Sequence, residues 1–66
     1  MNYQSNKAEE VKKQAAKDAA YWHALAQEKG SAELYERAGQ YYYTAGMNQL
    51  ANECWDAADT LRKGGA

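Results

Sequence analysis

GSAELYERAGQYYYTAG, residues 30–46, is the stretch that decides the fold. Glycine suits the left-handed residue that follows a helix, and serine suits the N-cap of the next helix. Gly30 and Ser31 therefore mark the end of one helix and the start of the next, and Gly46 marks the end of that second helix. The stretch predicts a helix over residues 32–45 with a turn on each side.

This expected helix has apolar residues on two sides. One stripe is Leu34, Ala38, Tyr41 and Ala45, and the other is Tyr35, Gly39, Tyr42 and Gly46. A helix that is apolar on two sides is usually covered on both, which places residues 32–45 centrally. Gly39 costs about 1 kcal/mol relative to alanine inside a helix, and close approach of a neighbouring helix is the expected reason for it. The alternative is that Gly39 and Gln40 form a turn that splits the segment.

Two further helices are expected, over residues 6–29 and 48–63. The first carries an apolar stripe at three- and four-residue steps: Ala8, Val11, Ala15, Ala19, Trp22 and Ala26. The second carries Leu50, Cys54, Ala57 or Ala58, and Leu61. Residues 1–5 and 64–66 are expected to be tails. The expected fold is all-α: one domain, residues 1–66, forming a small antiparallel three-helix bundle.

The expected helices differ in length. At 1.5 Å per residue the first spans about 36 Å and the second about 21 Å, so the second cannot cover all of the first. The N-terminal half of the first helix should project, carrying Ala8, Val11 and Ala15. Such a stripe can seat another helix, so these three residues are the candidate self-association site.

Aromatic residues are abundant for so short a chain, which has six tyrosines and two tryptophans in 66 residues. Tyr41, Tyr42 and Tyr43 are consecutive, so they spread over about 200° of a helix and cannot all face one neighbour. Tyrosine and tryptophan are frequent contact residues at interfaces. The candidate partner-binding residues are Tyr35, Tyr42, Tyr43 and Trp55, together with an acidic helical edge formed by Glu53, Asp56 and Asp59.

Charge and hydropathy exclude several classes of function. The net charge is −1, with +1 over residues 1–30 and −2 over the remainder, which disfavours nucleic acid and anionic membranes. A helix-turn-helix around Gly46 would direct Glu53, Asp56 and Asp59 towards phosphates, which is the wrong sign. No apolar run approaches the length of about 20 residues that spans a bilayer, and no signal peptide is recognisable. The expected location is the cytoplasm.

The sequence offers little for catalysis or metal binding. Cys54 is the only cysteine and His23 the only histidine, so neither an internal disulfide nor a Cys/His zinc site is possible within one chain. Cys54 lies on an apolar stripe, where cysteine acts as a small hydrophobe. We expect no enzyme activity, metal or cofactor. Because so short a domain is marginally stable alone, a homodimer or an obligate complex is expected.

Part of the chain resembles one tetratricopeptide (TPR) repeat. Trp22-x-x-Leu25-Ala26, then Gly30-Ser31, then Ala38-x-x-x-Tyr42-x-x-Ala45 are similar to that family's pattern over about 24 residues. The resemblance implies a hairpin of two packed helices and, by analogy, protein binding.

A second resemblance is to the ANR family of small negative regulators of AraC-type transcription activators. Glu36-x-x-Gly39-x-Tyr41-x-x-Thr44-Ala45 is similar to that family's central core. It implies inhibition of an activator through protein contacts.

These observations predict a small non-enzymatic protein-binding module of the kind that phages and other mobile elements often encode. It would act as an adaptor, inhibitor or regulator by occluding a surface of a larger protein. One alternative is a homo-oligomeric structural protein assembled through the projecting helix. The other is a small transcription-related regulator acting on an activator or on nucleic acid.

Overall fold

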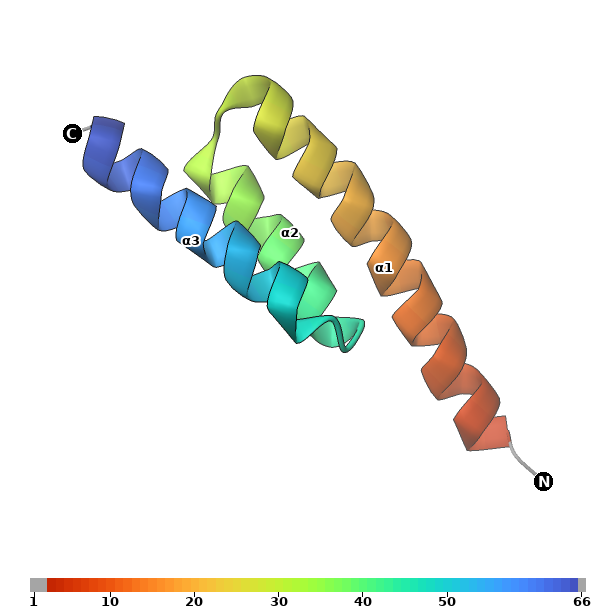
Figure 1. Ribbon diagram of the computed structural model, residues 1–66. Coiled ribbons are helices and arrows are strands. Elements are labelled where there is room, and N and C mark those ends of the chain that lie inside the picture. The colour runs from red at the N-terminus through yellow and green to blue at the C-terminus, as the bar shows by residue number, and fades with distance from the viewer. Residues whose placement is uncertain (1–2, 66) are drawn as a thin grey trace.

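The structure is a computed structural model that describes residues 3–65, with side chains described for residues 7–64. It contains the helices α1 (Tyr3–Lys29), α2 (Ala32–Thr44) and α3 (Asn48–Gly65). Consecutive helices run in opposite directions, and α2 lies between the other two (Figure 1). The predicted all-α, antiparallel three-helix bundle is confirmed.

The two turns form where glycine permits them. Gly30 has φ +61° and Gly46 has φ +82°, in the left-handed region that favours glycine. Ser31 precedes α2, and its hydroxyl accepts a hydrogen bond from the backbone N–H of Leu34 at 3.3 Å. The predicted N-cap is confirmed, and α2 ends at Thr44, one residue before the predicted end.

The outer helix boundaries differ from the expected ones. α1 begins at Tyr3 instead of residue 6, and α3 continues to Gly65 instead of ending at residue 63. No glycine or proline stands between residues 3 and 8 to interrupt a helix, and glycine weakens a helix end without forbidding it. Residues 3–5 and 64–65 are therefore helical, whereas residues 1, 2 and 66 of the expected tails lie outside the described range.

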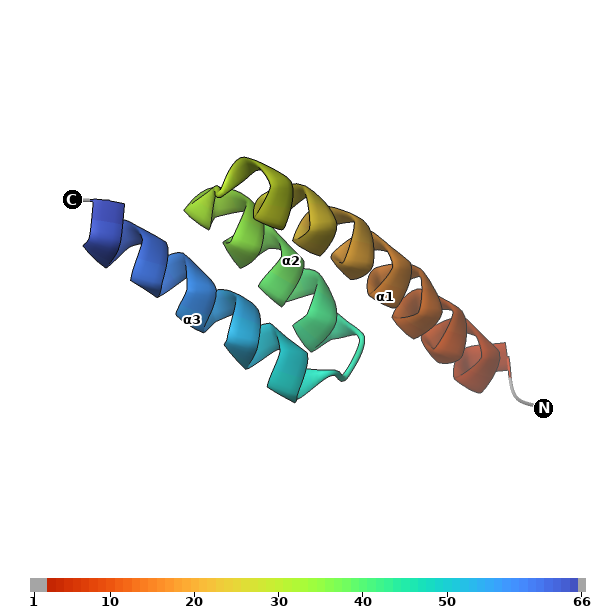
Figure 2. The ribbon, with the colours of Figure 1, turned by 45° about the horizontal axis from the view of Figure 1, so that its top comes forward.

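The helices form a thin, elongated layer. Extensive contacts join α2 to α1 and to α3, while α1 and α3 make only marginal contact with each other. The chain measures 53 × 17 × 13 Å along its principal axes, and Figure 2 shows α1 and α3 on opposite sides of α2. The predicted central position of α2, covered on two sides, is confirmed.

Short side chains form the core. Its central cluster consists of Ala19, Ala38, Tyr42, Ala51 and Cys54, and the largest fully buried side chain is that of Cys54. Trp22, Tyr35, Tyr41 and Leu50 pack around the cluster and stay partly exposed. Alanine lets helix backbones approach closely but contributes little apolar area, so Tyr42 supplies much of the burial in this core.

Gly39 lies inside α2 and is buried, so the alternative of a turn at Gly39–Gln40 is wrong. A Cβ atom added there would stand 2.4 Å from Nε1 and 2.7 Å from Cδ1 of Trp55. The indole of α3 occupies the space that a side chain at residue 39 would fill. The predicted reason for this glycine, close approach of a neighbouring helix, is confirmed.

The N-terminal half of α1 projects past the turn between α2 and α3 (Figure 1). Residues 7–14 are all exposed, and Val11 keeps 57% of its surface. Ala15 is only 5% exposed, so it belongs to the covered part of α1 and not to the projecting stripe. The candidate self-association surface is thereby reduced to Ala8 and Val11.

Candidate functional site: an exposed aromatic pair on α2 and α3

Tyr43 of α2 and Trp55 of α3 form an aromatic pair on the molecular surface. Their ring centroids lie 6.2 Å apart at an interplanar angle of 41°. Tyr43 is 62% exposed and Trp55 is 37% exposed. One edge of the indole rests against Gly39, which holds the ring in place while part of it faces solvent. Tyr43 points outwards, whereas its neighbours Tyr41 and Tyr42 pack in or against the core.

Two ion pairs lie near the aromatic pair. Arg62 of α3 pairs with Glu36 of α2, and Lys63 pairs with Asp59 at 3.1 Å. The hydrogen bond from Arg62 lowers the pKa of the Glu36 carboxyl, and the same bond raises the pKa of the guanidinium. Arg62 and Glu36 each expose about half of their side chains, 50% and 46%, so the bridge orients α3 on α2 and contributes little stability.

The predicted acidic edge runs along the exposed side of α3. Asp59 follows Trp55 by four residues and therefore shares its face, and Asp56 lies between Asp59 and Glu53, three residues from each. Glu53 is two residues before Trp55 and points to the opposite flank. Burial raises the pKa of both Tyr42 and Cys54, and the nearby charge of Glu53 adds to the rise, as does Cys54 for Tyr42. By helical register Asp59 lies closest to Trp55, Asp56 is intermediate, and Glu53 is farthest from the aromatic pair.

Tyr42 is a core residue, so its place among the candidate surface residues is corrected. It is 7% exposed, and its hydroxyl lies 3.0 Å from Nδ1 of His23 on α1. Tyr35 is half-buried and packs against the same imidazole, with ring centroids 5.9 Å apart. Position 42 points between α1 and α3, whereas position 43 is turned by about 100° towards solvent.

A second aromatic group on the α1 side was not predicted. The guanidinium of Arg37 lies over the ring of Trp22, 5.0 Å from its centroid, and Tyr21 meets the same indole edge-on at 5.2 Å. Trp22 lies on α1 and Arg37 lies on α2, so no local spacing in the sequence predicts this contact.

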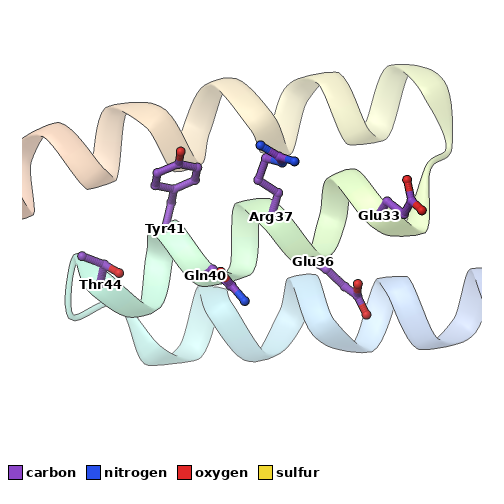
Figure 3. Close-up of a pocket in the computed structure, with 6 residues that line it drawn as sticks. All are labelled: Glu33, Glu36, Arg37, Gln40, Tyr41 and Thr44. Carbon is purple, nitrogen blue, oxygen red and sulfur yellow. The ribbon is translucent and has the colours of Figure 1, made fainter.

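A shallow polar groove follows the open face of α2. Its lining residues are Glu33, Glu36, Arg37, Gln40, Tyr41 and Thr44. Figure 3 shows Arg37 and Tyr41 pointing towards α1 and Glu36 pointing towards α3. Gln40 precedes Tyr43 by one turn, so the groove borders the aromatic pair. Its lining is mostly polar and mixed in charge, and the apolar contact surface belongs to Tyr43 and Trp55.

Cys54 and His23 both lie within the packed part of the fold. Burial raises the pKa of the Cys54 thiol, which disfavours the thiolate a nucleophile requires. The His23 imidazole is engaged by the Tyr42 hydroxyl. Within residues 3–65 no three His, Cys, Asp or Glu side chains converge as metal ligands.

None of the three helices, over the residues described, combines the length and apolarity needed to cross a bilayer.

Comparisons with known proteins found no match to this chain among family models, curated proteins or solved structures. The resemblances to TPR repeats and to ANR regulators therefore stay predictions.

Proposed function

We propose that the protein is a small non-enzymatic protein-binding module that occludes a surface of a larger protein. The observation that carries this proposal is the Tyr43–Trp55 pair. Both rings are substantially exposed, they lie side by side, and they come from different helices. Tyrosine and tryptophan dominate binding energy at protein interfaces because they bury large apolar areas with few rotatable bonds.

The packing around the pair supports this role. Trp55 is wedged against Gly39, and the Glu36–Arg62 bridge ties α3 to α2 on the same face. A partner would meet rings whose position is largely set before binding, so little side-chain entropy is lost on association. The polar groove beside the pair supplies hydrogen-bonding groups of the kind that surround an apolar contact.

Replacing Tyr43 with alanine is expected to weaken partner binding by more than about 1 kcal/mol, roughly fivefold in Kd. Tyr21→Ala is the matched control, because Tyr21 and Tyr43 are both 62% exposed tyrosines on helices. The target is first captured from nuclease-treated host lysate by the tagged protein, and its affinity for both variants is then measured by calorimetry. If the two variants bind the target with equal affinity, Tyr43 is not part of the binding site.

Self-assembly is the second candidate function, and the shape of the molecule favours it. The chain exposes 4900 Å² of surface. A compact monomer of 7.4 kDa exposes about 4,200 Å² by the usual scaling of area with mass. Part of the excess lies on the projecting segment of α1, where Val11 is 57% exposed.

If the projecting segment pairs with a second copy, Val11→Glu will dissociate the assembly, because a carboxylate in an apolar helix contact loses its hydration. Sedimentation equilibrium should then change from twice the chain mass of 7.4 kDa to one chain mass. Ala24→Glu, which adds the same charge at an exposed position of α1, should leave the mass unchanged. A monomeric wild-type protein would contradict the self-assembly function.

A further inference from the structure

We propose that the segment recognised by Tyr43 and Trp55 is a cationic one, a stretch of polypeptide that presents lysine or arginine side chains. This inference rests on the proposed protein-binding function and names the chemistry of its partner. It is carried by two independent features of one face of the α2–α3 hairpin: the two aromatic rings and the distribution of charge around them.

The first feature is the pair of rings. The face of an aromatic ring is negative, so it attracts ammonium and guanidinium groups, and tryptophan and tyrosine do so more strongly than phenylalanine. Tyr43 and Trp55 are tilted by 41° with centroids 6.2 Å apart, so they make two neighbouring acceptor surfaces on one patch. The protein forms such a contact within its own fold, where Arg37 lies 5.0 Å from the centroid of Trp22.

The second feature is an excess of carboxylate on the exposed side of α3, next to Trp55. Both cations of the last turn of α3 are already paired, Arg62 with Glu36 and Lys63 with Asp59. Asp56 has no ion pair among the described residues, and it lies one helical turn before Asp59, between Asp59 and Glu53. A cation that approaches the rings therefore meets an uncompensated negative charge, and an anion is repelled.

The ion pair between Asp59 and Lys63 can be replaced by an ion pair between Asp59 and the partner. Their side chains are 62% and 78% exposed, and exposed pairs at this helical spacing contribute very little stability. A lysine or arginine of the partner can replace Lys63 at the Asp59 carboxylate at small cost. Asp56 and Asp59 can then both receive cations from the partner while its remaining apolar groups cover the rings.

The test is an unbiased selection of peptides. A phage-displayed library of random peptides, about 12 residues long, is panned on the full-length wild-type protein and counter-selected on the Tyr43→Ala variant. Peptides that depend on Tyr43 are expected to be enriched in lysine and arginine relative to the unselected library. Tyr43-dependent peptides that are neutral or acidic would overturn the cationic partner while leaving protein binding in place.

The charge contribution is then measured with one selected synthetic peptide. The double variant Asp56→Asn/Asp59→Asn is expected to bind it roughly threefold to tenfold more weakly, and the difference should shrink in high salt. Glu28→Gln is the matched control, because Glu28 is an exposed carboxylate on α1, which lies on the other side of α2. Equal losses for the control and the double variant would contradict local recognition by Asp56 and Asp59.

The remaining outcomes are also decisive. A selection that yields no Tyr43-dependent peptide would overturn the proposed function together with this inference. If Tyr43→Ala instead converts a dimer to a monomer in sedimentation equilibrium, a second copy of the chain occupies the aromatic pair, and the separate cationic partner is ruled out.

Discussion

Tyr42→Ala is expected to unfold most of the protein at room temperature, whereas Tyr43→Ala leaves the fold intact. Tyr42 is 7% exposed and is the one aromatic side chain in the central cluster of the core. Truncating a buried aromatic residue to alanine costs about 3–5 kcal/mol. In a domain of 66 residues a single hydrophobic core rarely supplies more than about 3–5 kcal/mol of stability. The surrounding alanines have no side-chain length with which to fill the resulting cavity.

Urea denaturation followed by circular dichroism measures this difference. Tyr43→Ala is the control from the adjacent residue, and its free energy of unfolding should lie within about 1 kcal/mol of wild type, because Tyr43 is 62% exposed. Tyr42→Phe separates the ring from its hydroxyl: loss of the contact with His23 should cost about 1 kcal/mol. Similar losses for the two alanine variants would contradict the assignment of Tyr42 to the core.

Gly39→Ala is expected to destabilise the wild-type protein but to stabilise a variant that lacks the Trp55 side chain. In the wild-type protein the new methyl group would stand 2.4 Å from the indole nitrogen, so the ring has to move away from α2. Such overpacking typically costs about 1–3 kcal/mol, which exceeds the gain of about 1 kcal/mol from replacing glycine inside a helix. In a Trp55→Ala background the obstacle is gone, and the same substitution should stabilise the protein by about 1 kcal/mol.

A double-mutant cycle of Gly39→Ala and Trp55→Ala, measured by urea denaturation, tests this reversal. Gly64→Ala serves as the control, because a Cβ atom there meets nothing within 4 Å and its effect should be independent of Trp55. In the Gly39→Ala single variant, the displaced Trp55 should also alter binding at the aromatic pair. Equal effects of Gly39→Ala in both backgrounds would show that the glycine and the indole are not coupled.

The helices and their order could be predicted because their signals are local. The helix ends depend on residues such as Gly30 and Ser31, whose backbone preferences act within a few positions. The central place of α2 followed from two apolar stripes on one helix. The outer boundaries at Tyr3 and Gly65 were predicted less well, because no strong breaker or cap marks those ends.

The candidate site could be predicted only in part. Tyr43 and Trp55 were predicted as partner-binding residues from the three consecutive tyrosines and from the frequency of tyrosine and tryptophan at interfaces. Their contact with each other required the relative placement of α2 and α3, which are antiparallel and in close approach at Gly39. Tyr42 was wrongly predicted as a surface residue, because consecutive tyrosines look alike in the sequence. Only the packing of the helices shows which of them is buried.

The sequence by itself determined an all-α chain with three helices, a central α2, and a first helix too long to be covered. These properties follow from capping, helical periodicity and length, which act along the chain. Tertiary structure alone decided that Trp55 rests on Gly39 beside Tyr43, that Arg37 lies over Trp22, and that Arg62 pairs with Glu36. These contacts join residues from different helices, and the rotation and separation of the packed helices decide which of them meet.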